Sequence, residues 1–249
     1  MNNKNQLTLS QHFYELKKRV IACFAFFIAI FCFCYYNATS ITKWFIQIGK
    51  DAGFTVGYVT PQEMLIQSLR LCGTLALVAS LPLIIWNVLA FIMPAISSQR
   101  VHKLIATGVL VFFSLFALGI VFCIKILFPF VFQYLYSYSK GFGVTGYATV
   151  SSFLSLFLTT AWIMGFLFEV PLFSALLTFA GVLNHTTMQK GLKPAIAIIA
   201  IIAAIITPPD VVSMMIVGIP MIAIYIFSIG VSSVSYTHLR AHETLSDLV

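Results

Sequence analysis

Six long apolar runs constrain this chain more than any other feature of its sequence. They cover residues 20–36, 71–93, 104–124, 153–182, 194–206 and 211–230. About 20 apolar residues in a helix cross the hydrocarbon core of a bilayer, and the runs lack the in-out alternation of barrel strands. With 60% hydrophobic and 8% charged residues, the chain has too few charges to coat a water-soluble domain. The sequence therefore predicts an all-α polytopic membrane protein, a single domain over residues 1–233 with six transmembrane helices.

Two of the runs depart from the ordinary length of a crossing. The fifth is short for a hydrocarbon core of about 30 Å, so it either spans a locally thinned membrane or forms a tight hairpin with the sixth. The third continues as apolar sequence past residue 124. We expect this helix to project beyond the bilayer, with Lys125 reaching for the interface and Pro129 bending the helix.

Basic residues are distributed unevenly between the loops. One side carries Lys4, Lys17, Lys18, Arg19, Arg100, Lys103, Lys190 and Lys193, with Glu15 as its acid. The other side carries Lys43, Lys50, Arg70 and Lys140, offset by Asp51, Glu63 and Asp210. Because cytoplasmic loops are enriched in Lys and Arg, both termini are predicted to be cytoplasmic. The net charge of +7 reflects this asymmetry and gives no support to nucleic-acid binding.

Glu169 is the carboxylate that lies inside a long apolar segment. Such a residue costs several kcal/mol unless it is neutralised, paired or wetted, so it marks a candidate functional site. Pro171 leaves the carbonyl of Leu167 without its helical hydrogen bond, and polar groups are expected to gather there. Three interpretations stay open: a structural hydrogen bond, a proton or ion pathway, and a binding site. Thr159, Thr160 and Ser174 on the same helix, and Ser114 on the third, are the predicted polar neighbours.

The amino-terminal segment reads as an amphipathic helix that leads into the first crossing. Leu9, Phe13, Leu16 and Val20 form an apolar stripe, and His12, Glu15 and Arg19 share the opposite face. Glu15 either pairs with Lys18 or Arg19 along the helix or offers a carboxylate to an incoming guanidinium, where bidentate geometry gives selectivity.

Two outer loops carry signals of local structure. Pro61 followed by Glu63 is typical of a helix start, and the tandem prolines Pro208 and Pro209 stop the fifth helix so that Asp210 can cap the sixth. No soluble-enzyme motif is present, and all five cysteines lie in or beside apolar runs, so the sequence predicts no enzyme activity, no metal, no cofactor and no disulfide.

Residues 234–249 break with the rest of the chain. The run VSYTHLRAHET over residues 234–244 resembles the translation of a transposase sequencing adapter. We therefore expect a non-native tail. His238 and His242, beside Glu243, are excluded as metal ligands for this reason.

An ordered series of motifs resembles the TatC family, the multi-spanning subunit of the twin-arginine protein translocase. The motifs are HFYELKKR over residues 12–19, TPQE over 60–63, FIMPA over 91–95 with Pro94, FLFEVP over 166–171, TPPD over 207–210 with Ser213, and Pro220. Their order and spacing cover residues 8 to about 233. The resemblance implies a glove-shaped receptor that moves folded proteins with the proton-motive force.

The resemblance also implies partners and sites. Twin-arginine signal peptides would bind at the cytoplasmic face, and TatA-like and TatB-like single-span subunits would join a hetero-oligomer within the lipid. On this interpretation the signal-binding set is His12, Glu15, Leu16, Arg19, Gln99 and Arg100. Glu169, beside Pro171, would be a polar docking group for signal or partner helices.

Two positions depart from the family pattern. An acid that the family usually carries after the second helix falls here on Gln99 or Arg100, and a helix-six carboxylate falls on Ile226. A desolvated guanidinium needs a full counter-charge, so these losses predict weaker or relaxed signal recognition. The expected location is a bacterial inner membrane, or alternatively an organellar inner or thylakoid membrane. The rival function is a proton-coupled small-solute transporter with Glu169 as its relay, although no internal repeat supports it.

Overall fold

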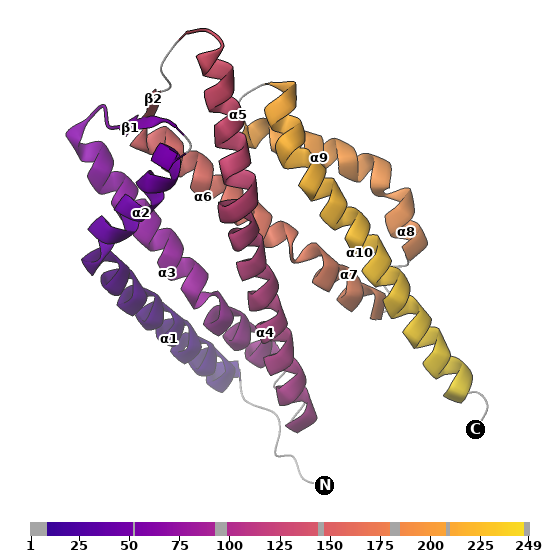
Figure 1. The fold of residues 1–249 in the computed structure, drawn as a ribbon. Helices are drawn as coiled ribbons and strands as arrows, with labels where there is room; N and C mark the ends of the chain where they lie inside the picture. The colour runs from indigo at the N-terminus through magenta and orange to yellow at the C-terminus, as the bar shows by residue number, and fades with distance from the viewer. Residues whose placement is uncertain are drawn as a thin grey trace. The chain divides into compact units, whose positions relative to one another are not determined.

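Helices account for almost all of the described chain. The computed structural model describes residues 9–51, 53–92, 99–143, 147–179, 185–207 and 210–246, and side chains over a subset of these. The helices are α1 (Leu9–Tyr36), α2 (Ala38–Asp51), α3 (Pro61–Ile92), α4 (Gln99–Phe122), α5 (Phe128–Lys140), α6 (Val150–Leu167), α7 (Val170–Phe179), α8 (His185–Lys190), α9 (Leu192–Ile206) and α10 (Val211–Ser246) (Figure 1). A π-helical turn, η1 (Cys123–Leu127), joins α4 to α5, and two short strands are β1 (Thr55–Gly57) and β2 (Tyr147–Thr149).

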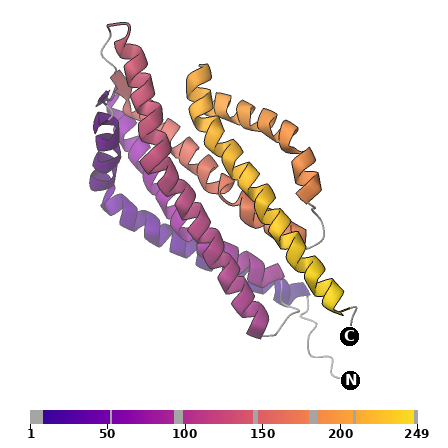
Figure 2. The same ribbon diagram turned by 45° about the vertical axis from the view of Figure 1, so that its right-hand side comes forward.

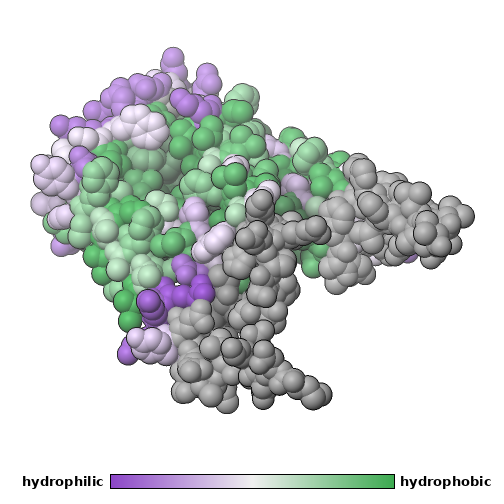
Figure 3. All heavy atoms as spheres, turned by 90° about the horizontal axis from the view of Figure 1, so that it is seen from below, coloured by the Kyte–Doolittle hydropathy of each residue, from purple (hydrophilic) through white to green (hydrophobic). Residues whose placement is uncertain are grey.

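Within the described residues, five helical segments are long and apolar enough to cross a membrane. They are Leu16–Tyr36, Pro61–Leu89, Ala106–Lys140, Val150–Thr178 and Val211–Ser233. The sixth apolar helix, α9, is shorter, at 15 residues. The predicted all-α, multi-pass class is therefore confirmed. Figure 3 shows that much of the coloured surface on one face is hydrophobic.

The helices extend past several of the predicted apolar runs. α3 begins at Pro61 rather than at residue 71, because Glu63 accepts a hydrogen bond from the Val59 backbone N–H at 2.9 Å and fixes the first turn. α1 begins at Leu9, before the first run. Both starts lie outside the apolar runs, but they agree with the predicted amphipathic amino-terminal helix and with the predicted helix start at Pro61.

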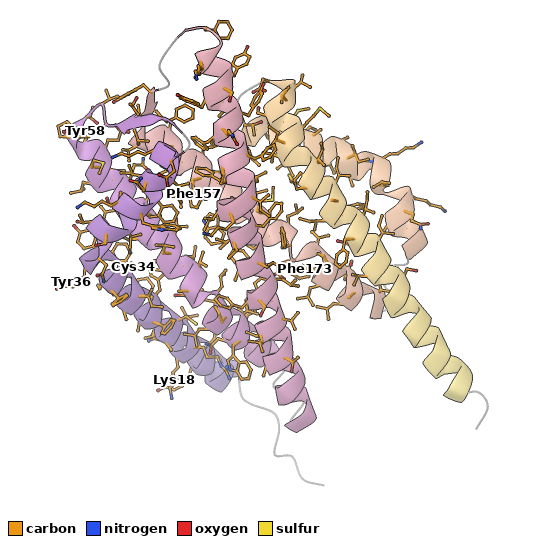
Figure 4. The ribbon with its side chains drawn as sticks, viewed as in Figure 1. Lys18, Cys34, Tyr36, Tyr58, Phe157 and Phe173 are labelled. Carbon is orange, nitrogen blue, oxygen red and sulfur yellow. The ribbon has the colours of Figure 1, made fainter. Side chains whose placement is uncertain are left out.

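The chain divides into two compact units, one of residues 1–47 and 58–114 and the other of residues 48–57 and 115–249. In the first unit α1 packs along α3 (Figure 1). Figure 4 shows Lys18 and Tyr36 toward opposite ends of α1. Phe24, Phe27, Phe31 and Tyr35 form a ladder along α1 with successive ring centroids 6.2 to 6.5 Å apart.

α4, η1 and α5 follow one another as a continuous helical segment, which belongs to the second unit from residue 115 onward and has a wide turn at η1. Pro129 has no N–H to offer the Lys125 carbonyl, and the Phe128 N–H instead reaches the Cys123 carbonyl, five residues back. The predicted disturbance at Pro129 is thus a π turn. Within it Lys125 is exposed and Cys123 is fully buried.

An aromatic cluster fixes α5 against α6. Phe128 lies 5.3 Å from Phe153 and 4.8 Å from Phe157 between ring centroids, both edge-on, and Phe54 contacts Phe132 at 5.5 Å. Beside this cluster β1 pairs in parallel with β2, Val56 opposite Ala148. Residues 48–57 therefore pack with the second unit, although the chain on either side of them belongs to the first.

The remaining helices of the second unit gather along α10. α10 contacts α7 and forms a hairpin with α9, joined through the loop that ends at Asp210 (Figure 2). This agrees with the predicted hairpin between the fifth and sixth apolar runs.

Candidate functional site

Glu169 lies at a break between two half-helices. α6 ends at Leu167 and α7 begins at Val170, with Phe168 and Glu169 in a turn between them. Pro171 has no N–H for the Leu167 carbonyl, and the Glu169 N–H bonds the Phe166 carbonyl, three residues back, at 3.1 Å. The Phe173 N–H then bonds the Glu169 carbonyl at 3.0 Å and restarts the helix. The predicted single helix over 153–182 is therefore two helices, and the cause is Pro171.

The carboxyl group of Glu169 is buried without a partner. The residue is 0% exposed, and neither Oε1 nor Oε2 has a hydrogen-bond partner among the described residues. The backbone of Phe116 is near enough to act on the carboxyl electrostatically, but the contact falls outside hydrogen-bond geometry. A buried polar group left unpaired costs about 1–3 kcal/mol, and an ionised one costs more. The two carboxyl oxygens of Glu169 therefore lack hydrogen bonds, which a group from another molecule could supply.

Two glycines let α4 and α6 approach closely just before this break. A Cβ on Gly119 would lie 2.6 Å from the Met164 carbonyl oxygen, and a Cβ on Gly165 would lie 2.7 Å from the Phe116 ring. Phe122 and Phe168 close the same face with ring centroids 5.5 Å apart. The turn that carries Glu169 is therefore held by tight packing.

Three of the four hydroxyl groups predicted to surround Glu169 donate elsewhere, and the fourth, on Thr159, is exposed. Ser174 donates to the Pro171 and Ser228 carbonyls at 2.8 and 3.2 Å, and Thr160 donates to the Leu156 carbonyl at 2.7 Å. Ser114 donates to the Leu110 carbonyl. Because a Ser or Thr in a helix readily bonds the carbonyl three or four residues back, these side chains are not available to the carboxyl.

A buried seam of hydroxyl groups, which was not predicted from the sequence, joins α7 to α10. Ser174 contacts the Ser228 carbonyl, and one turn further on Thr178 Oγ1 lies 2.6 Å from Ser232 Oγ. All four residues are 3% exposed or less. The spacing of four residues on both helices was the available signal, since small polar residues at this spacing mark close helix contacts in membranes.

Asp210 caps α10, as the sequence predicts. Its Oδ2 accepts a hydrogen bond from the Ser213 N–H at 2.8 Å, and its Oδ1 accepts one from the Ser213 hydroxyl. These bonds, with another from the Tyr134 hydroxyl, hold the pKa of Asp210 below its usual value. Pro208 and Pro209 lie outside the described residues.

The predicted signal-binding set is placed only in part. His12, Glu15 and Arg19 lie on α1, and Gln99 and Arg100 are the first residues of α4. The side chains of His12, Glu15, Gln99 and Arg100 lie outside the described residues, as does the whole of Pro94. Leu16 and Arg19 are described, and both line a groove between α1 and α3.

The described residues hold no group of three or more His, Cys, Asp or Glu side chains that could bind a metal ion. The five cysteines are free thiols, three of them buried. Among the described side chains, Glu169 therefore stands as the principal chemical feature of the interior.

Comparison with known proteins gives one consistent result. The family model of TatC, the Sec-independent protein translocase protein, matches residues 11–220. The chain is 29% identical over 244 residues to Sec-independent protein translocase protein TatCd of Bacillus subtilis (strain 168), covering 97% of this chain and 98% of that protein. It is 30% identical over 223 residues to TatC of Helicobacter pylori (strain ATCC 700392 / 26695), covering 89% and 85%.

Solved structures agree in fold. A crystal structure of the twin-arginine translocase receptor TatC superposes with a TM-score of 0.75 at 24% identity, covering 90% of this chain and 99% of that one. A second crystal structure of the same receptor, in the detergent DDM, gives a TM-score of 0.70 at 26% identity, covering 89% and 99%.

Proposed function

This chain belongs to the TatC family, and from that premise we propose that it is the core receptor subunit of a twin-arginine translocase. The family match over residues 11–220 carries the proposal. The protein is then a membrane transport subunit and no enzyme. Family membership also decides against the rival interpretation of Glu169 as the relay of a small-solute transporter.

The proposed signal-binding site comprises His12, Glu15, Leu16, Arg19, Gln99 and Arg100. Helical geometry supports the first part of this set, because residues 12, 15 and 19 fall on one face of α1. Glu15 is the acid of this face and would receive a guanidinium group of the twin-arginine signal in a bidentate pair. With Gln99 in place of a second acid, recognition would rest mainly on Glu15.

Glu169 is proposed to dock a transmembrane helix of a TatA-like or TatB-like partner or of the signal peptide. Its two unpartnered oxygens support this role, since a polar side chain on a passing helix would satisfy them. The partner would thereby lower the cost of a buried carboxyl group. The proposed location is a bacterial inner membrane, in keeping with the bacterial relatives.

Photo-crosslinking to a signal peptide tests the receptor function. A photoreactive residue would be placed at Leu16 or Lys103, and at Tyr138 on α5 as a control position. We expect labelling of a twin-arginine signal peptide from residues 16 and 103 but not from 138. A twin-lysine peptide should label at least about fivefold less, because lysine lacks the planar fork of arginine.

The outcome separates two kinds of failure. No labelling from residues 16 and 103 would refute the signal-binding site. Equal labelling by the twin-lysine peptide would show that the site binds signal peptides without recognising arginine. That result would be explained by Gln99, which stands where the family usually has an acid.

A further inference from the structure

A long apolar groove runs between α1 and α3 in the first unit. Its volume is about 670 Å³, and it is lined by Leu16, Arg19, Val20, Cys23, Phe24, Phe27, Leu77, Ile84, Asn87 and Val88. Side chains of both walls remain open, with Phe24 63% and Val88 51% exposed. None of these residues belongs to the Glu169 site.

The groove has the depth of one membrane leaflet. From Leu16 to Phe27 α1 rises about 16 Å, at about 1.5 Å per residue. The hydrocarbon core is about 30 Å thick, so one leaflet contributes about 15 Å. The length of the groove thus matches the length of one extended acyl chain. A helix that crossed the whole bilayer would be about twice as long as the groove.

The interior of the groove is already satisfied in its hydrogen bonding. Asn87 Nδ2 donates to the Leu83 carbonyl at 2.8 Å and to Cys23 Sγ at 3.4 Å. The amide donors are therefore engaged within the protein. An apolar occupant meets this wall without leaving them unpaired.

Positive charge gathers at one end of the groove. The half-buried Arg19 lines it, and the exposed Lys17 and Lys18 precede Arg19 on α1. Among the described side chains that line the groove, none is acidic. A guanidinium group at the end of an apolar channel complements a phosphate that bears a hydrocarbon chain.

We propose that this groove binds one anionic phospholipid from the leaflet at the amino-terminal end of α1. One acyl chain lies between α1 and α3, and Arg19 binds the phosphate. The lipid would seal the lipid-facing side of the α1–α3 pair and link the position of Arg19 to membrane composition.

Native mass spectrometry of the purified full-length chain tests the proposal without any signal peptide. The detergent-solubilised protein is titrated with phosphatidylglycerol or with phosphatidylcholine of the same acyl chains. We expect the anionic lipid to bind about fivefold or more tightly, as one added Arg contact would give. Equal binding of the two lipids would overturn the proposal.

Two matched pairs of variants locate the bound lipid. Arg19→Gln should abolish the preference for the anionic lipid, while Lys18→Gln, which removes a charge beside the groove, should keep it. Val88→Trp should fill the groove and reduce binding of both lipids, while Ile28→Trp, at a 43% exposed position on α1 outside the groove, should not. If the two variants of either pair change lipid binding equally, the lipid does not bind in this groove and the proposal is overturned.

A photoreactive phosphatidylglycerol keeps the test independent of how well the variants fold. In the wild-type protein its acyl-chain label should map to α1 and α3 near Phe24, Phe27 or Leu77. Labels confined to other helices, or displaced when a single-span partner copurifies, would overturn the proposal. Either failure leaves the receptor function intact, because no signal peptide enters these measurements.

Discussion

Glu169 combines full burial with two carboxyl oxygens that no described group satisfies. Groups of this kind lower stability and persist where a partner needs them. The neighbouring hydroxyls keep their own helix carbonyls as acceptors, so the deficit belongs to the carboxyl itself. Replacing Glu169 by an apolar residue should therefore stabilise the isolated chain and weaken its binding of the partner helix.

Replacing Glu169 tests this opposition. Glu169→Leu should raise the thermal unfolding midpoint of the isolated protein, because it removes an unpaired buried carboxyl worth about 1–3 kcal/mol. The same variant should retain about tenfold less of a TatA-like or TatB-like subunit in copurification, by the scale of interhelical hydrogen bonds in membranes. Glu169→Gln is the control and should keep most of the partner. Unchanged copurification with Glu169→Leu would rule out a docking role.

Asp210 gives a pH-dependent prediction. Asp210→Ala should lower the stability of the chain by about 1 kcal/mol, the usual value of a helix cap. Since folding lowers the pKa of Asp210, the charge contributes fully above the unfolded value of about 3.9 and is lost as the pH falls below it. Thermal unfolding at pH 7 and pH 3 should show a smaller gap between wild type and Asp210→Asn at pH 3 than at pH 7. A gap that is independent of pH would contradict the assignment.

At the scale of elements, the contact of α4 with α6 depends on the absence of a side chain. A Cβ on Gly119 would meet a backbone carbonyl oxygen at 2.6 Å, and backbone yields less readily than the end of a flexible side chain. Gly119→Ala should therefore cost about 1–3 kcal/mol of stability. Gly108, on the same helix, has no neighbour within 4 Å of such a Cβ.

Gly108→Ala is thus the matched control, expected to be neutral or to stabilise by up to about 1 kcal/mol through helix propensity. Thermal unfolding of both variants in the same detergent makes the comparison. Similar midpoints would mean that the two helices can move apart freely.

The sequence predicts the crossing helices because each is long and apolar, and it predicts the helix breaks because proline acts locally. It predicts α2, β1 and β2 poorly, because these elements are short and the two strands depend on contacts between distant parts of the chain. β1 has three residues, and its strand identity comes from Val56 meeting Ala148 far along the chain. The surroundings of Glu169 were beyond prediction too, because a hydroxyl such as Ser174 can bond its own helix or a neighbour, and only packing decides which.

At the scale of the whole molecule, the arrangement of charge predicts the topology. In a variant without the native cysteines, Lys18→Cys and Lys190→Cys should react with an impermeant maleimide only from the cytoplasmic side. Lys43→Cys and Lys140→Cys should react only from the opposite side. Labelling of residue 190 from the same side as residue 43 would contradict the proposed number of crossings before it.

The pairing of β1 with β2 also sets an order in time. Thr55 must wait for Tyr147, which follows about 90 residues later in the chain. Synthesis at about 5–20 residues per second makes that interval about 5–18 s, long compared with the formation of a helix or a hairpin. During it, residues 48–57 have no strand to pair with, while α3 is synthesised and can pack on α1. The first unit can therefore assemble during synthesis, whereas the second must await most of the chain.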